Sequence, residues 1–208
     1  MVNIGMNVVL AVLLSLIIST FIGFLNGIII AELRMPALIV TFASQTIFAG
    51  YAYIICGGVP ISRMPESFLK LGQGYVGPIP VPVIVMVVIF AIGTFILNKT
   101  YFGRYFYALG GNEEAALLSG IKIKVVKCLV YSLSGLFAGI AGLVMLARAN
   151  TAQPNAGVGY EFDVITCVVL GGVSVNGGSG KMSNVIAGVL IIGVLSNGMV
   201  LMNISSYM

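Results

Sequence analysis

Five long apolar runs alternate with polar connections along the chain. The runs are Gly5–Ala31, Ala37–Cys56, Val81–Leu97, Val125–Ala147 and Ser183–Met202. A helix of about 20 apolar residues crosses the ~30 Å of hydrocarbon in a bilayer, because each residue adds ~1.5 Å. The pattern therefore predicts five membrane-spanning helices.

A sixth apolar segment, Phe162–Val173, is shorter and is followed by glycine-rich sequence. As a helix it would reach only ~18 Å, too little for an ordinary span. We expect a short broken helix there, which either crosses fully or re-enters the membrane. The predicted fold class is all-α: a polytopic transmembrane helix bundle of about five full spans plus one short broken helix, in a single domain over residues 1–208.

The connection between the second and third runs, Gly57–Pro80, is rich in glycine and proline and carries Arg63, Glu66 and Lys70. It is too polar to lie in hydrocarbon. Within it, Met64–Leu71 is predicted to form a short interfacial helix.

The composition supports this pattern, with 59% hydrophobic and only 8% charged residues. Soluble domains carry roughly 25% charged residues, so this chain is not a soluble enzyme. The basic residues lie outside the apolar runs, which argues against nucleic acid as a partner. Cys56, Cys128 and Cys167 are far apart and histidine is absent, so we expect packing cysteines and no metal or redox site.

Basic residues also predict the orientation. If the polar stretch Lys99–Lys127 is cytoplasmic and the short segment crosses, most of the chain's basic residues share that side. The predicted cytoplasmic set is Arg34, Lys99, Arg104, Lys122, Lys124, Lys127 and Lys181. The external set is Arg63, Lys70 and Arg148. This bias fits the positive-inside rule. Both chain ends are then external. We interpret this arrangement as a sign that the sequence is part of a longer protein.

The stretch Gly110–Ile121 predicts a short capped helix within the cytoplasmic connection. Asn112 is a suitable N-cap, and Glu113 and Glu114 match the positive end of the helix dipole. Gly120 suits the left-handed residue that ends a helix. So short a helix needs a surface to pack on, because it is not stable alone in water. An ordinary interfacial connector would have the same local sequence.

The spacing Glu-Ala-Ala, three residues, then Gly resembles the cytoplasmic EAA loop of ABC importer permeases. The residues that carry it are Glu114, Ala115, Ala116 and Gly120. A register that uses Glu113 is also possible, and the Leu-Pro pair that often follows in the family is missing. The resemblance implies a coupling helix over residues 112–121, within a cytoplasmic segment of about 99–127, that docks onto a separate ATP-binding subunit.

Further segments resemble the monosaccharide branch of these permeases, the ribose, galactose and xylose type. They are residues 103–131, 152–157, 159–163 and 168–172. The similarity covers essentially the whole chain, although the opening and closing helices of the family are not found in it. It implies the permease subunit of an ATP-driven sugar importer in the bacterial inner membrane, working by alternating access, with neither catalytic residues nor a cofactor of its own. The implied partners are the ATP-binding subunit, an external sugar-binding protein, a second permease subunit in a homodimer, and membrane lipid.

The sequence Gly177-Gly178-Ser179-Gly180-Lys181 superficially resembles a phosphate-binding P-loop. Val175 stands where a P-loop requires glycine, and Met182 replaces the hydroxyl residue that would bind magnesium. We therefore predict a tight turn at the membrane surface, and ATP bound by another chain.

Four polar residues within the apolar runs are candidates for the transport pathway: Asn26, Thr41, Gln45 and Asn197. Neutral hydrogen-bonding groups suit a sugar, and polar groups in a membrane should face the bundle interior or a water-filled path. Hydrogen bonds between helices explain each of them equally well.

Two GxxxG pairs predict close helix packing within the subunit rather than a dimer contact: Gly23 with Gly27, and Gly135 with Gly139. Glu161 and Asp163 lie at the start of the short apolar segment, where a capped helix start at the outer interface is the expected role.

Two other classes of function fit the sequence less well. An ion-coupled secondary transporter would require ionisable residues in mid-span, and none is convincingly placed there. A purely structural membrane protein would leave the capped helix unexplained.

Overall fold

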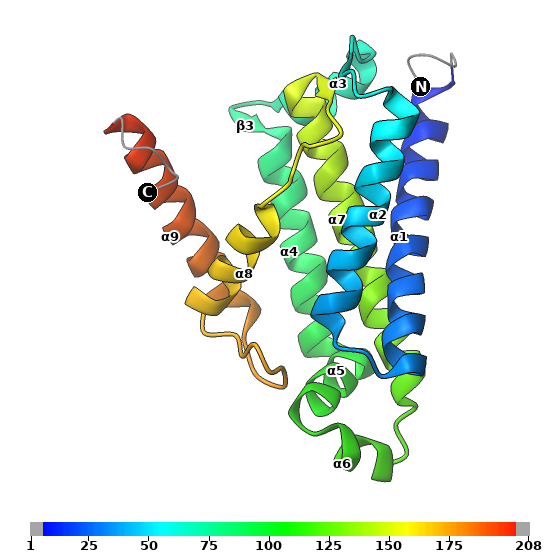
Figure 1. Ribbon diagram of the computed structural model, residues 1–208. Coiled ribbons are helices and arrows are strands. Elements are labelled where there is room, and N and C mark those ends of the chain that lie inside the picture. The colour runs from blue at the N-terminus through cyan, green and yellow to red at the C-terminus, as the bar shows by residue number, and fades with distance from the viewer. Residues whose placement is uncertain (1–5, 203–208) are drawn as a thin grey trace. The chain divides into compact units, whose positions relative to one another are not determined.

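The computed structural model describes residues 6–202, and most of them are helical (Figure 1). The helices are α1 (Val8–Leu33), α2 (Ala37–Cys56), α3 (Glu66–Gln73), α4 (Val81–Lys99), α5 (Tyr101–Gly111), α6 (Glu113–Leu118), α7 (Ile123–Ala149), α8 (Tyr160–Leu170) and α9 (Met182–Leu201). Four two-residue strands form two antiparallel pairs: β1 (Ile61–Ser62) with β4 (Thr151–Ala152), and β2 (Tyr75–Val76) with β3 (Ile79–Pro80).

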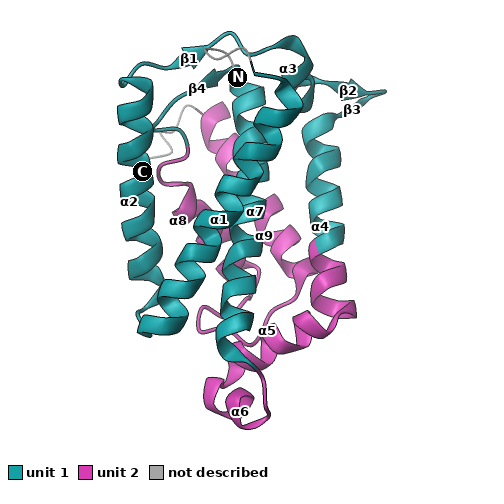
Figure 2. Cartoon of the chain, turned by 90° about the vertical axis from the view of Figure 1, so that its right-hand side faces the viewer, with its two compact units in different colours: residues 1–92, 122–156 teal, residues 93–121, 157–208 magenta. Residues whose placement is uncertain are grey.

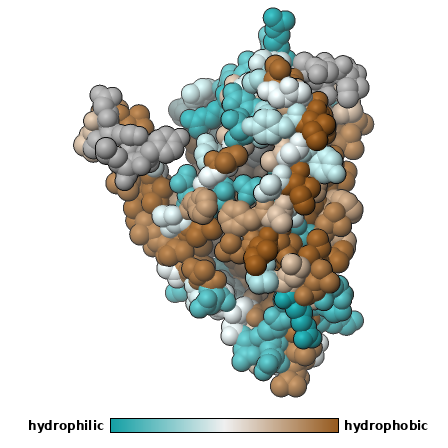
Figure 3. Space-filling model, in the orientation of Figure 1, coloured by the Kyte–Doolittle hydropathy of each residue, from teal (hydrophilic) through white to brown (hydrophobic). Residues whose placement is uncertain are grey.

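Among the described residues, five helices are long and apolar enough to cross a membrane: α1, α2, α4, α7 and α9. The predicted all-α class and its five spans are confirmed, and the chain is a multi-pass membrane protein. On the face shown in Figure 3, hydrophobic residues predominate across the middle of the view, and many of the most hydrophilic residues lie near its top and bottom. Two side chains on α2, Ile54 and Ile55, are 78% and 84% exposed, as expected for residues that face lipid.

Predicted and observed helix boundaries differ by only a few residues. The predicted interfacial helix at Met64–Leu71 is α3, which begins at Glu66. It starts two residues later because Pro65 disfavours a helical conformation at Met64. Gly5, the predicted start of the first span, lies outside the described residues. The side chain of Asn7 caps α1 by accepting a hydrogen bond from the Val9 amide at 3.0 Å.

The chain forms two compact units, which Figure 2 shows in different colours. Unit 1 comprises residues 1–92 and 122–156, and unit 2 comprises residues 93–121 and 157–208.

The α1–α7 contact organises unit 1. It uses the two predicted glycine pairs, Gly23 with Gly27 and Gly135 with Gly139. A Cβ atom on Gly23 would overlap the carbonyl oxygen of Tyr131, and one on Gly135 would overlap that of Ser19. The predicted packing within the subunit is thus confirmed, because backbones this close leave no room for a side chain.

The long connection between α2 and α4 folds over one end of unit 1. Phe68 of α3 is 2% exposed and forms a small apolar core with Met64 and Ala147, near the end of α7. Gly72 allows the approach, because a Cβ there would lie 2.8 Å from the Cβ of Ala147. The β1–β4 pair holds the start of this connection beside the residues that follow α7. A segment that looks irregular in sequence is therefore packed.

Unit 2 contains a hairpin of α8 and α9. A Cβ on Gly188 of α9 would overlap the carbonyl oxygen of Cys167 in α8, and one on Gly171 would lie 2.6 Å from the carbonyl oxygen of Asn184. The 11 residues of α8 extend only ~16 Å, so it is the predicted short helix. At its start, the Glu161 carboxylate accepts a hydrogen bond at 3.0 Å from the backbone amide of Gly159, the residue just before the helix.

Candidate functional site

The N-terminal cap predicted for α6 is present. The side-chain oxygen of Asn112 accepts a hydrogen bond from the amide of Ala115 at 2.9 Å. Glu113 and Glu114 occupy the first turn, where their charges are favourable toward the helix dipole. The local sequence therefore determines where this helix begins.

The C-terminal end of α6 is closed by a Schellman motif. Gly120 has φ +81°, the left-handed conformation expected from the sequence. Its amide bonds to the carbonyl of Leu117 at 2.9 Å, and the amide of Ile121 bonds to that of Ala116 at 3.1 Å. These two bonds satisfy carbonyls that the end of a helix leaves unpaired. The six-residue helix has a defined geometry at both ends.

Two adjacent leucines on α6 face solvent. Ala116 is 4% exposed, whereas Leu117 is 60% and Leu118 is 89% exposed. An apolar pair beside the charged residues Glu113 and Glu114, outside the apolar runs, is typical of a surface that contacts another protein.

The helix before it, α5, was not predicted. The Thr100 side chain is its N-cap. Gly103 forms the corner with α4, because a Cβ there would lie 2.7 Å from the carbonyl oxygen of Ile96. A signal was available in the sequence: Phe102, Phe106 and Leu109 recur at helical spacing directly after a capping threonine.

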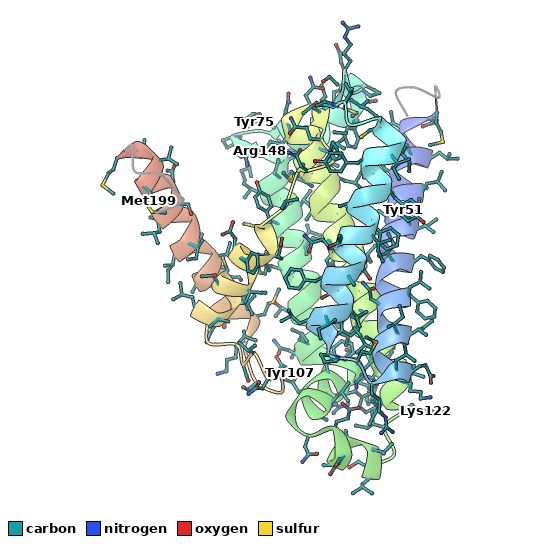
Figure 4. The ribbon with its side chains drawn as sticks, in the orientation of Figure 1. Tyr51, Tyr75, Tyr107, Lys122, Arg148 and Met199 are labelled. Atoms are coloured by element: carbon teal, nitrogen blue, oxygen red, sulfur yellow. The ribbon has the colours of Figure 1, made fainter. Side chains whose placement is uncertain are left out.

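The far end of α5 rests on the glycine-rich turn between α8 and α9. A Cβ on Gly110 would overlap the amide nitrogen of Gly178 and would lie 3.1 Å from its Cα. The Tyr107 hydroxyl donates a hydrogen bond to the carbonyl of Gly180 at 2.9 Å. Figure 4 shows Tyr107 beside this turn. The sequence offers no signal that pairs these segments.

The turn itself has the backbone conformation that only glycine adopts readily. Gly177 and Gly178 have φ values of +91° and +75°. The amide of Ser174 bonds to the carbonyl of Ser179 across the turn at 3.0 Å. The predicted tight turn is confirmed.

The two ends of unit 1 carry polar and charged residues from different connections of the chain. Glu32, at the end of α1, accepts a hydrogen bond from the Lys124 ammonium near the start of α7 at 2.6 Å. Figure 4 shows Lys122 at this end and Tyr75 and Arg148 at the other. Within unit 1, the end of α1 and the start of α7, whose basic residues are predicted to lie on one side of the membrane, thus share one end.

The four pathway candidates fall into different surroundings. Asn26 of α1 accepts a hydrogen bond from the hydroxyl of Ser44 on α2, a partner that the sequence analysis did not single out. Thr41 bonds to the carbonyl of Ala37 in its own helix at 3.0 Å. Gln45 is exposed on α2, and Asn197 is exposed on α9 in unit 2. A hydrogen bond between side chains therefore joins Asn26 to the neighbouring helix α2.

A protein-family model described as "Branched-chain amino acid transport system / permease component" matches residues 1–207. Among curated proteins, the ribose import permease protein of Haemophilus influenzae is 42% identical over 211 residues, covering 100% of this chain and 65% of the relative. The ribose import permease protein of Bacillus subtilis is 45% identical and covers 98% of this chain and 64% of the relative.

The L-arabinose transport system permease protein of Escherichia coli is 45% identical over 182 residues, covering 88% of this chain and 56% of the relative. The chain thus spans about two thirds or less of the length of these relatives. No solved structure matches it.

Proposed function

We propose that this chain, which belongs to the family of branched-chain amino acid transport system permease components, is part of the membrane-spanning subunit of an ATP-driven importer for a monosaccharide. The observation that carries the proposal is the doubly capped helix α6, which exposes Leu117 and Leu118 outside the apolar runs. The relatives named as ribose and arabinose permeases support the same function.

The helix α6 is the docking element for a separate ATP-binding subunit. Its caps define its direction and length, so a partner meets a rigid helix rather than a flexible loop. The exposed leucines would enter an apolar pocket of the partner. Asn112, Glu113, Glu114, Ala115, Ala116 and Gly120 shape the helix.

The transported substrate is a sugar rather than an amino acid. The family description names branched-chain amino acids, but the relatives that are 42–45% identical are named for the pentoses ribose and arabinose. Neutral polar side chains such as Asn26 and Ser44 suit a hydroxyl-rich, uncharged substrate, because they form hydrogen bonds without trapping it. Thr41, Gln45 and Asn197 are further candidates for the pathway.

The complete importer is a bacterial inner-membrane assembly. It contains two copies of the permease, the ATP-binding subunit on the cytoplasmic side, and an external sugar-binding protein. The permease itself is not catalytic. Closure of the ATP-binding subunits moves α6, and the spanning helices respond by alternating access.

The docking assignment is tested by replacing Leu118 with aspartate in the permease expressed with its ATP-binding subunit. A charge buried in an apolar pocket is costly, so we expect the ATP-binding subunit to be lost from the purified permease. The matched control is Val59→Asp, because Val59 is 65% exposed but lies in the connection predicted to be external. Equal retention of the ATP-binding subunit by both variants would contradict docking at α6.

The substrate assignment requires a transport measurement. The importer in proteoliposomes, with its binding protein, should take up labelled ribose or arabinose when supplied with ATP, and should not take up labelled leucine. Uptake of leucine without either sugar would show that the amino-acid description fits better.

A further inference from the structure

We propose that Tyr107 and Gly110 of α5 are positioning residues that transmit movement of α6 to the α8–α9 hairpin. The inference rests on the proposed function, because it assigns these residues a role in coupling ATP hydrolysis to sugar transport. Every residue in the link belongs to unit 2.

The first part of the link is the direct connection of α6 to α5. Only Asn112 separates Gly111, the end of α5, from Glu113, the start of α6. Asn112 is bonded to both helices. Its backbone amide donates a hydrogen bond to the carbonyl of Ala108 in α5 at 3.1 Å, and its side chain caps α6. A displacement of α6 therefore acts on the end of α5.

The second part is a backbone contact between α5 and the glycine-rich turn. Gly110 and Gly178 lie against each other, and a Cβ on Gly178 would stand 2.6 Å from the Cα of Gly111. No side chain intervenes that could absorb a small movement by changing its rotamer. The Tyr107 hydroxyl adds a hydrogen bond to the Gly180 carbonyl, which opposes sliding of the two segments.

The third part joins the turn to both helices of the hairpin. Gly180 packs against Val173, since a Cβ there would lie 2.9 Å from the methyl groups of that side chain. On either side of the turn, Gly171 approaches Asn184 and Gly188 approaches Cys167, backbone against backbone. Closely packed elements of this kind move together rather than deform. A push on the turn would thus shift α8 and α9 as one body.

The test uses the permease assembled with its ATP-binding subunit and sugar-binding protein in proteoliposomes, with sugar uptake and ATP hydrolysis measured together. In Gly110→Ala the new methyl group would collide with the Gly178 backbone. We expect the ATP-binding subunit to stay bound and to hydrolyse ATP, while sugar transported per ATP falls at least tenfold. Gly111→Ala is the matched control, because its Cβ would meet nothing within 4 Å.

A second variant, Tyr107→Phe, removes only the hydroxyl and should leave folding intact if Gly110→Ala does not insert. The loss of one hydrogen bond predicts a two- to tenfold fall in sugar per ATP. If the variant that inserts and assembles transports as much sugar per ATP as the wild type, the proposed link between α6 and the hairpin is wrong. A parallel loss of the bound ATP-binding subunit would overturn the link as well, since the residues would then serve docking alone. If the wild-type assembly moves no sugar, the proposed function itself fails.

Discussion

Gly23 of α1 and Gly135 of α7 meet in the membrane, and a Cβ on Gly23 would lie 3.1 Å from the Cα of Gly135. Both belong to GxxxG pairs, and each pair provides the surface against which the other packs. In lipid, apolar surface gives no hydrophobic driving force between helices, so close van der Waals contact has to hold the pair together.

Replacing Gly23 with alanine should destabilise the permease, because the methyl group would overlap the Tyr131 carbonyl oxygen. Overpacking of this kind costs about 1–3 kcal/mol. We expect a lower Tm for the detergent-purified protein. Gly142→Ala on α7 is the control, because a Cβ there meets nothing within 4 Å. Equal Tm values for the two variants would show that α1 and α7 are not packed this closely.

The end of α6 permits a test that separates backbone strain from crowding. A Cβ on Gly120 would meet nothing within 4 Å, but its φ is +81°. Valine is strained in this conformation by about 1–2 kcal/mol, whereas asparagine tolerates it. Gly120→Val should therefore impair sugar uptake by the assembled importer with normal membrane insertion, and Gly120→Asn should transport nearly as the wild type does. Full uptake by the valine variant would contradict a functional role for this cap.

The membrane orientation is testable with single cysteines at two exposed serines, Ser67 in α3 and Ser119 after α6. In a background without the three native cysteines, an impermeant thiol reagent added to intact cells should label the cysteine at position 67 and spare the one at 119. Both positions should react after the cells are permeabilised. Labelling of position 119 alone in intact cells would reverse the predicted topology.

The ion pair between Glu32 and Lys124 should contribute little to stability, although its atoms approach to 2.6 Å. The side chains of Lys124 and Glu32 are 64% and 52% exposed, so water and salt screen the attraction. We expect Lys124→Ala to change the free energy of unfolding by less than about 1 kcal/mol. A Tm loss as large as that of Gly23→Ala would indicate that this end of the helix pair is held by charge.

The amino-acid sequence determined the features of this protein that depend on neighbouring residues. Long apolar runs predicted the five spans, because a helix in lipid satisfies its backbone hydrogen bonds internally and needs only length and apolar side chains. Asn112 and Gly120 predicted both ends of α6, since helix caps are made by residues within one or two turns.

Contacts between distant segments were decided by the tertiary structure. The sequence indicated that Gly23 and Gly27 would pack closely, but the partner helix α7 is known only from the three-dimensional arrangement. The same holds for Tyr107 and Gly180, and for Phe68 against Ala147. No local rule pairs residues more than 70 positions apart. Their contact depends on how each segment packs after the helices have formed, and only the folded chain specifies that.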